Sequence, residues 1–181
     1  MSNYKINNPD GVYFVTLTVV EWVDVFTRKR YVEIVLDSLR HCQQAKGLVI
    51  YAWCIMSNHV HLIIAKEKEP TLSDILRDFK KYTSSQIIKS IKEEPESRRN
   101  WMLWIFSSAA KKNSNNTNYQ FWQQNNQPKE LISNEFMEQK LDYIHLNPVE
   151  AGIVEYAKDY LYSSARDYEG SKGLLDIQFI E

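Results

Sequence analysis

Alternating apolar and polar positions mark three strands in the first third of the chain. Residues 12–20, VYFVTLTVV, alternate in part and are rich in β-branched and aromatic residues, which predicts a strand. Residues 48–56 and 60–65 predict two more strands. The turn residues Ser57 and Asn58 separate them, so we expect a hairpin.

Helical spacing marks three other segments. Residues 31–46 carry apolar side chains three and four positions apart and stop before Gly47, a residue that commonly ends helices. Residues 71–92 form the longest apolar stripe. A third helix is predicted over residues 134–146, and we expect Pro148 to end it.

The remaining segments complete an α+β pattern. Residues 107–120 are small and polar and predict a mobile loop, residues 121–122 predict a short strand, and the chain after 155 forms a C-terminal extension. The order strand–helix–hairpin–helix–strand–helix is not that of a doubly wound parallel sheet. It favours a single α+β domain over residues 1–181, with an antiparallel sheet and helices packed on one face.

Composition indicates an ordinary globular protein and excludes a membrane span. Hydrophobic residues make up 44% and charged residues 25% of the chain. No apolar run approaches the roughly 20 residues that a span needs, and the N-terminus lacks an apolar leader. Cys42 and Cys54 form neither a zinc spacing nor a disulfide framework, so we predict a cytoplasmic protein with no membrane partner.

Charge leaves nucleic-acid binding open. The net charge of −1 does not favour it, but basic residues cluster locally, at Arg28-Lys29-Arg30, Lys80-Lys81, Arg98-Arg99 and Lys111-Lys112. Such clusters are either solvated surface or a track for a phosphate backbone.

His59 and His61 are candidate metal ligands. Side chains two apart on a strand point to the same face, so the two imidazoles should lie side by side, while Val60 points into the core. Two surface histidines at a turn would give the same pattern. The rest of this strand is apolar, which favours a metal site over two surface histidines.

Tyr143 and Asn147 form a second candidate pair. Tyr143 lies on the last predicted helix and Asn147 follows four residues on, so both lie on one helical face, one turn apart. A tyrosine can attack phosphorus when a metal polarises the phosphate, and an amide oxygen can be a metal ligand. Taken alone, Tyr143 is better explained as a core tyrosine, and composition cannot select one of the 11 tyrosines in the chain.

Two motifs resemble those of a known enzyme family. Residues 51–63, YAWCIMSNHVHLI, are similar to the metal-binding hairpin of the single-tyrosine HUH transposases, in which U is a hydrophobic residue. Residues 141–154, LDYIHLNPVEAGIV, resemble the nucleophile segment YIxxNPVxAG of the REP-associated tyrosine transposases. With weaker matches elsewhere, the resemblance spans roughly residues 10–168.

The resemblance implies a fold, a reaction and a set of roles. It implies a ferredoxin-like or RRM-like fold and a substrate of single-stranded DNA, usually near a hairpin. The tyrosine would attack a phosphodiester, form a 5′-phosphotyrosine link and free a 3′-hydroxyl. By position, His59 and His61 bind a divalent metal, Mg²⁺ or Mn²⁺, with Asn147 as third ligand and Tyr143 as nucleophile.

The helix after the hairpin suggests a DNA contact. Arg77, Lys80 and Lys81 lie there at the border of the apolar stripe, and we predict that they contact DNA phosphates.

Three other classes of protein compete with this interpretation. An RRM-like binding module without chemistry could stack bases on Trp53, Tyr51 and Phe14. A replication or conjugation nickase would share the motifs, and a structural zinc domain would need cysteine pairs. Oligomeric state stays open, with a homodimer as one option.

Overall fold

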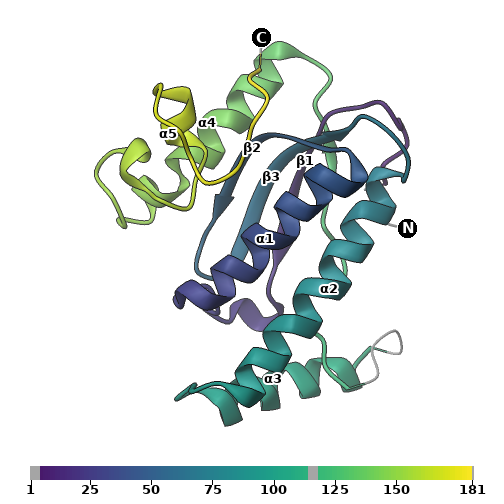
Figure 1. Ribbon diagram of the computed structural model, residues 1–181, viewed down its shortest axis with the longest axis vertical. Helices are drawn as coiled ribbons and strands as arrows, with labels where there is room; N and C mark the ends of the chain where they lie inside the picture. The colour runs from purple at the N-terminus through teal and green to yellow at the C-terminus, as the bar shows by residue number, and fades with distance from the viewer. Residues whose placement is uncertain (1–4, 114–117, 181) are drawn as a thin grey trace.

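A four-stranded antiparallel sheet forms the centre of the molecule (Figure 1). The computed structural model describes residues 5–113 and 118–180. The strand order is β2-β3-β1-β4, with bounds β1 Tyr13–Thr18, β2 Leu48–Ile55, β3 His59–Lys66 and β4 Lys129–Glu130. The predicted hairpin is confirmed as β2 and β3. The short strand predicted at residues 121–122 is a single bridge from Trp122 to Val19.

The helices begin and end close to the residues expected from the pattern. Their bounds are η1 Val20–Trp22, α1 Lys29–Lys46, α2 Leu72–Glu93, α3 Arg99–Lys111, α4 Asn134–Glu150, η2 Ala157–Asp159 and α5 Ala165–Tyr168. Gly47 ends α1 in a left-handed conformation, with φ of 66°. The side chains of Thr71 and Ser133 accept backbone N–H bonds and begin α2 and α4.

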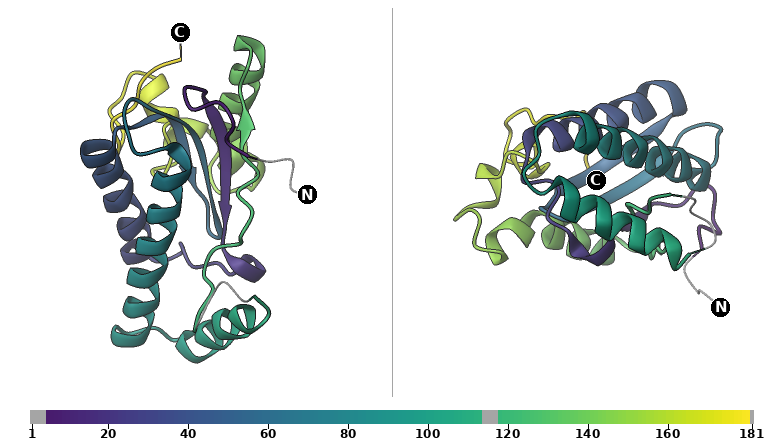
Figure 2. Two further views of the ribbon diagram at one scale, coloured as in Figure 1. Left: turned by 90° about the vertical axis from the view of Figure 1, so that its right-hand side faces the viewer. Right: turned by 90° about the horizontal axis from the view of Figure 1, so that it is seen from below.

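The two faces of the sheet are covered by different helices. α1 and α2 pack on one face, over a core that includes Leu17, Trp53 and Val60. α4 packs on the other face (Figure 2). There Ile144 joins a smaller cluster around Phe14. The α+β antiparallel class is therefore confirmed. The expectation of helices on one face holds for α1 and α2 only, because α4 has its own apolar stripe.

Part of the predicted loop at 107–120 is helical, which corrects the prediction. Residues 107–111 are the last turn of α3, and residues 114–117 lie outside the described part. Met102, Phe106 and Ala110 are buried at intervals of four, so the helix has one face in the core. The small residues before the lysines are good helix formers or tolerated, which explains why polarity alone was misleading.

Pro148 does not end α4, contrary to the prediction. It lies within the last turn, and the helix continues to Glu150. The end comes at Gly152, whose φ is 69° and whose N–H bonds to the carbonyl of Val149. A glycine in this conformation is a common helix terminator. Asn147 consequently remains on the helix, one turn after Tyr143.

The C-terminal extension covers the outer edge of β2. Cys54 forms a bridge with Ser163, and the N–H of Ser164 bonds to the carbonyl of Trp53. Further along, the N–H of Gln178 bonds to the carbonyl of Ile50. The extension thereby protects an edge that would otherwise be open to pairing with another strand. Within the described residues, no helix is long and apolar enough to cross a membrane.

A buried carboxylate joins the start of α1 to the start of α3. The side chain of Glu96 is fully buried and contacts Arg28, Arg30 and Arg98. Tyr31 donates its hydroxyl proton to the same carboxylate at 3.0 Å. Three of the arginines that could have tracked a phosphate backbone are therefore held by an internal ion cluster.

We expect Glu96→Gln to destabilise the fold and to weaken its acid sensitivity. Burial alone would raise the pKa of Glu96, but hydrogen bonds from the Arg98 backbone, Arg28 and Tyr31 lower it to about 2. The charge therefore stabilises the fold above pH 4.5, and this contribution is lost as the pH falls from 4.5 towards 2. Unpairing such a cluster typically costs about 3–5 kcal/mol.

Urea unfolding followed by circular dichroism at several pH values measures both effects. The exposed Glu93, changed to Gln, is the matched control and should leave the acid profile unchanged. An acid profile in Glu96→Gln that equals the wild-type profile would contradict the assignment.

Candidate active site

His59 and His61 lie side by side at the start of β3. Both project from the face that α4 covers, whereas Val60 points into the core beneath α1 and α2. The two ring centroids are 4.6 Å apart. The prediction that the two imidazoles share one face is confirmed by this geometry.

Neighbouring side chains fix how the two rings are oriented. Asn58 donates its amide N–H to the Trp22 carbonyl and to Asp24, so its oxygen faces His59 Nδ1, 2.7 Å away. Nδ1 of His59 must then carry the proton, which leaves the lone pair on Nε2. His61 Nδ1 lies 2.9 Å from the hydroxyl of Thr16, its partner in the sheet register. Both rings are held through Nδ1, the usual way of orienting metal-binding histidines.

Burial keeps both imidazoles uncharged. Burial lowers the pKa of His59 below its usual 6.5, and a side-chain hydrogen bond with Asn147 partly offsets the effect. Burial lowers the pKa of His61 to about 3, with smaller contributions from His59 and Lys140. A neutral imidazole has a lone pair available for a metal, whereas a protonated one does not.

Tyr143 reaches the histidines from α4. Its ring centroid is 5.2 Å from that of His61 and 6.0 Å from that of Phe14. The adjacent Ile144 is fully buried and anchors the helix on the sheet. Tyr143 itself is 42% exposed, so its ring is not sealed in the core and substrate can reach it.

Asn147 lies between the helix and the histidines. Its Nδ2 atom is 3.5 Å from His61 Nε2, and its side chain also interacts with His59. The spacing of four residues from Tyr143 therefore brings both side chains to the histidine pair, as the helical pattern predicted.

Four other residues complete the site and were not predicted from the sequence. The side chains of Thr16 and Asn58 contact Nδ1 of His61 and of His59. The Phe14 ring packs against the rings of His61 and Tyr143. The ammonium group of Lys140 lies 5.3 Å from the centre of the Tyr143 ring. Lys140 precedes Tyr143 by three residues on a helix, so this spacing could have identified it. The others depend on strand register.

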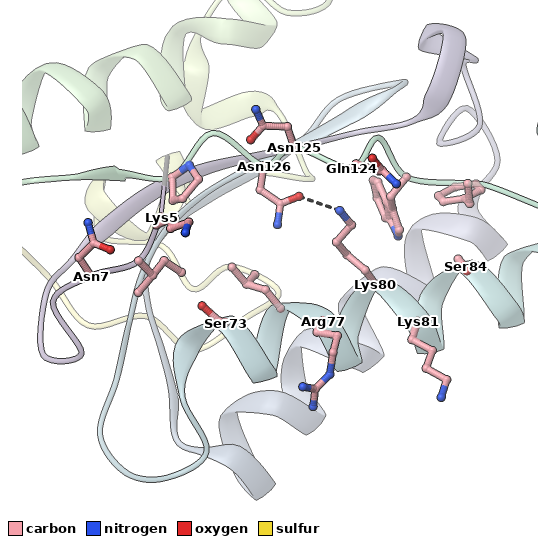
Figure 3. A pocket seen from close by; sticks show the side chains of 15 residues that line it. Lys5, Asn7, Ser73, Arg77, Lys80, Lys81, Ser84, Gln124, Asn125 and Asn126 are labelled. Carbon is pink, nitrogen blue, oxygen red and sulfur yellow. Dashed lines mark hydrogen bonds between the residues drawn. The ribbon is translucent and has the colours of Figure 1, made fainter. Parts of the chain in front are cut away.

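Arg77, Lys80 and Lys81 are not part of this site. They lie on α2, across the sheet, beside a groove of about 1000 Å³ (Figure 3). Lys80 donates to the carbonyl of Gln123 and to Asn126 Oδ1, at 2.7 and 2.8 Å. Burial lowers the pKa of Lys80 to about 8. Its ammonium group is thus bound by protein acceptors, whereas the DNA contacts expected of Arg77, Lys80 and Lys81 stay a prediction.

The structure also bears on two competing classes. Trp53 is fully buried and Phe14 nearly so, so neither can stack on a base as a binding module would require. Cys42 and Cys54 are free and buried. Among the described residues, no group of three or more His, Cys, Asp and Glu side chains could hold a metal ion.

Comparisons with known proteins agree with this site. The family model described as "Transposase IS200 like" matches residues 12–124, a stretch that includes the histidine pair and ends before Tyr143. A solved structure of the REP-associated tyrosine transposase bound to a REP hairpin is similar to this chain, with a TM-score of 0.65 and 18% identity. The match covers 100% of this chain and 98% of the other. No curated protein in the comparison matches the chain.

The fold and the histidine pair define a transposase of the HUH type. The chain belongs to the family of IS200-like transposases, because the family model spans most of its length. The family expected from the two motifs is thereby confirmed.

Proposed function

We propose that this transposase cleaves and rejoins single-stranded DNA with Tyr143 as its nucleophile. The observation that carries the proposal is the position of the exposed Tyr143 ring, whose centroid is 5.2 Å from that of the buried His61. The centroid of the His59 ring is 4.6 Å from that of His61. Tyr143 belongs to α4 and the histidines to β3, so the fold joins segments more than 80 residues apart at one point.

The cleavage step exchanges one phosphodiester for another. The Tyr143 oxygen forms a bond to phosphorus and loses its proton, while the bond from phosphorus to the 3′ oxygen breaks. The leaving strand takes up a proton as a 3′-hydroxyl, and its partner stays linked as a 5′-phosphotyrosine. Attack by a 3′-hydroxyl reverses the step, so rejoining needs no external energy source. The ammonium group of Lys140 lies 5.3 Å from the centre of the Tyr143 ring, so a positive charge is present beside the proposed nucleophile.

The donor set fits a divalent metal, which enzymes of this family require. The side chains of His59, His61 and Asn147 lie together, and the contacts at Nδ1 of both rings leave the Nε2 side of each imidazole directed towards Asn147 and the site. We propose Mg²⁺ or Mn²⁺ at this position, with phosphate oxygens as further ligands. When bound, it would polarise the scissile phosphate.

Hairpin DNA is the substrate that we propose. The similar solved transposase is bound to a REP hairpin. In the present chain, one molecule brings His59, His61 and Tyr143 together without a second copy. We therefore propose that a single chain can complete the site, in place of a dimer that shares it.

The basic side chains of the groove on α2 are proposed to contact the DNA backbone. Lys81 is exposed and Arg77 is paired only with surface carboxylates, those of Asp74 and Asp78. We expect Lys81→Ala to lower the slope of log affinity against log salt by roughly 0.7–0.9, the value for one lost phosphate contact. Hairpin binding measured by fluorescence anisotropy over a salt series gives this slope.

The control is Lys89→Ala. Lys89 is exposed on the same helix but does not line the groove. Equal slopes for wild type and Lys81→Ala would assign Lys81 to solvated surface.

Covalent capture tests the proposed function directly. The protein is incubated with a hairpin oligonucleotide that carries a labelled single-stranded extension, with Mn²⁺ or with EDTA. A metal-dependent, denaturation-resistant adduct that maps to Tyr143 by peptide mass spectrometry is expected. Hairpin binding without any adduct would favour the binding module instead.

A further inference from the structure

An exposed tryptophan lies next to the active-site hairpin and has no structural explanation. Trp22 ends η1, directly after β1, and 64% of it is exposed. Glu21 and Trp22 both adopt left-handed backbone conformations, with φ of 53° and 49°. This region is unfavourable for residues other than glycine, and such strain is concentrated at functional sites. The fold thus accepts a strained backbone in order to present a large apolar ring to solvent.

The same segment is tied to the metal hairpin. The Trp22 carbonyl accepts a hydrogen bond from Asn58 Nδ2 at 3.3 Å, and Asn58 Oδ1 accepts one from His59 Nδ1 at 2.7 Å. η1 projects on the side of the sheet that α4 occupies, away from α1 and α2 (Figure 2). The backbone of Trp22 is therefore connected through Asn58 to His59, one of the proposed metal ligands.

Trp22 lines a cavity of about 460 Å³. Side-chain amides of Gln123 and Gln124 and the cationic Lys112 line it as well. A flat aromatic surface, amides and one cation are the groups that bind a base, its polar edge and a phosphate. Gln124 also lines the groove on α2, where Figure 3 labels it. The two cavities therefore share this residue.

We propose that Trp22 stacks on a base of the single-stranded DNA that flanks the cleavage site. This inference rests on the proposed function and identifies a residue that positions the strand. The amides of Gln123 and Gln124 bind the edge of that base, and Lys112 contacts the adjacent phosphate. The strand then continues past Gln124 towards Lys81.

The test combines a substitution with an abasic scan. Binding is measured by anisotropy with the hairpin oligonucleotide and its single-stranded extension, in a Tyr143→Phe background that prevents cleavage. Trp22→Ala should weaken binding roughly 5- to 150-fold, the effect of one lost stacking contact, and Trp22→Phe should restore most of the affinity. Trp104→Ala is the matched control, since Trp104 is 66% exposed but does not line the cavity.

Coupling between protein and DNA decides the result. When Trp22 is intact, an abasic nucleotide at one position of the extension should weaken binding as much as Trp22→Ala does. In the Trp22→Ala variant, the same abasic nucleotide should cause no further loss of affinity. Additive losses at every position would overturn the proposal, as would equal weakening on a hairpin without extension. If Trp22→Ala fails to fold, the affinities of Trp22→Phe and wild type for the series of abasic oligonucleotides are compared instead. If no abasic position weakens binding by either protein, the proposal is overturned. Failure of the proposed function differs, because the wild type would then form no adduct.

Discussion

Replacing Tyr143 with phenylalanine is expected to abolish the covalent DNA adduct while the fold and hairpin binding persist. The substitution removes one oxygen, and in the described part of the chain no hydrogen bond to that oxygen is found. The ring keeps its contacts with Phe14, His61 and Lys140. Loss of the attacking atom should reduce adduct formation by at least about a thousandfold, since no other group replaces a missing nucleophile.

Tyr82→Phe provides the matched control. Tyr82 is also exposed on a helix beside basic residues, but it lies on α2, across the sheet from the histidines. Adduct yield is measured by gel shift under denaturing conditions, and thermal melting checks the fold. A persistent adduct in Tyr143→Phe would make the assignment wrong, and loss in Tyr82→Phe would point to the other tyrosine.

Strand alternation and helical spacing in the sequence predicted those relations in the site that lie within a single strand or helix. The alternation of β3 placed His59 and His61 on one face, and the turn of α4 brought Tyr143 and Asn147 together. These relations depend only on backbone geometry. They needed no knowledge of how the elements pack.

Relations between elements could not be obtained in this way. Thr16 contacts His61 because β1 pairs with β3 in one register, and sequence spacing does not determine that register. The choice of sheet face for α4 is likewise a packing result. Arg28 and Arg98 appeared as basic surface clusters, yet a single carboxylate 68 residues after Arg28 binds both.

Local composition was misleading at two helix ends. The polar run after Phe106 suggested a loop, although buried Met102 and Ala110 continue the apolar stripe of α3. Pro148 suggested an end to α4, but a proline in the last turn forfeits only one backbone bond, and Gly152 supplies the real terminator.

Replacing either His59 or His61 with alanine is expected to remove metal binding and strand cleavage together. Nδ1 of each ring is already engaged, by Thr16 and by Asn58, and no third histidine lies beside this pair among the described residues. A bound metal contributes several kcal/mol to phosphoryl transfer, so cleavage should fall by about a thousandfold or more. Hairpin affinity should change little, because phosphate and base contacts supply it separately.

Thermal melting with Mn²⁺ gives a readout that does not depend on catalysis. At a hundredfold excess over Kd, wild type should melt about 5–10 °C higher than in EDTA, because a ligand that binds only the folded state stabilises it. His59→Ala is the cleaner variant, since His61 is buried and its loss also removes packing against Phe14. His41→Ala, an exposed histidine on α1, should retain the full shift and full cleavage. A His59→Ala protein that still shows both would exclude this pair as the metal site, because one imidazole with Asn147 is too small a donor set to hold the ion in place against solvent.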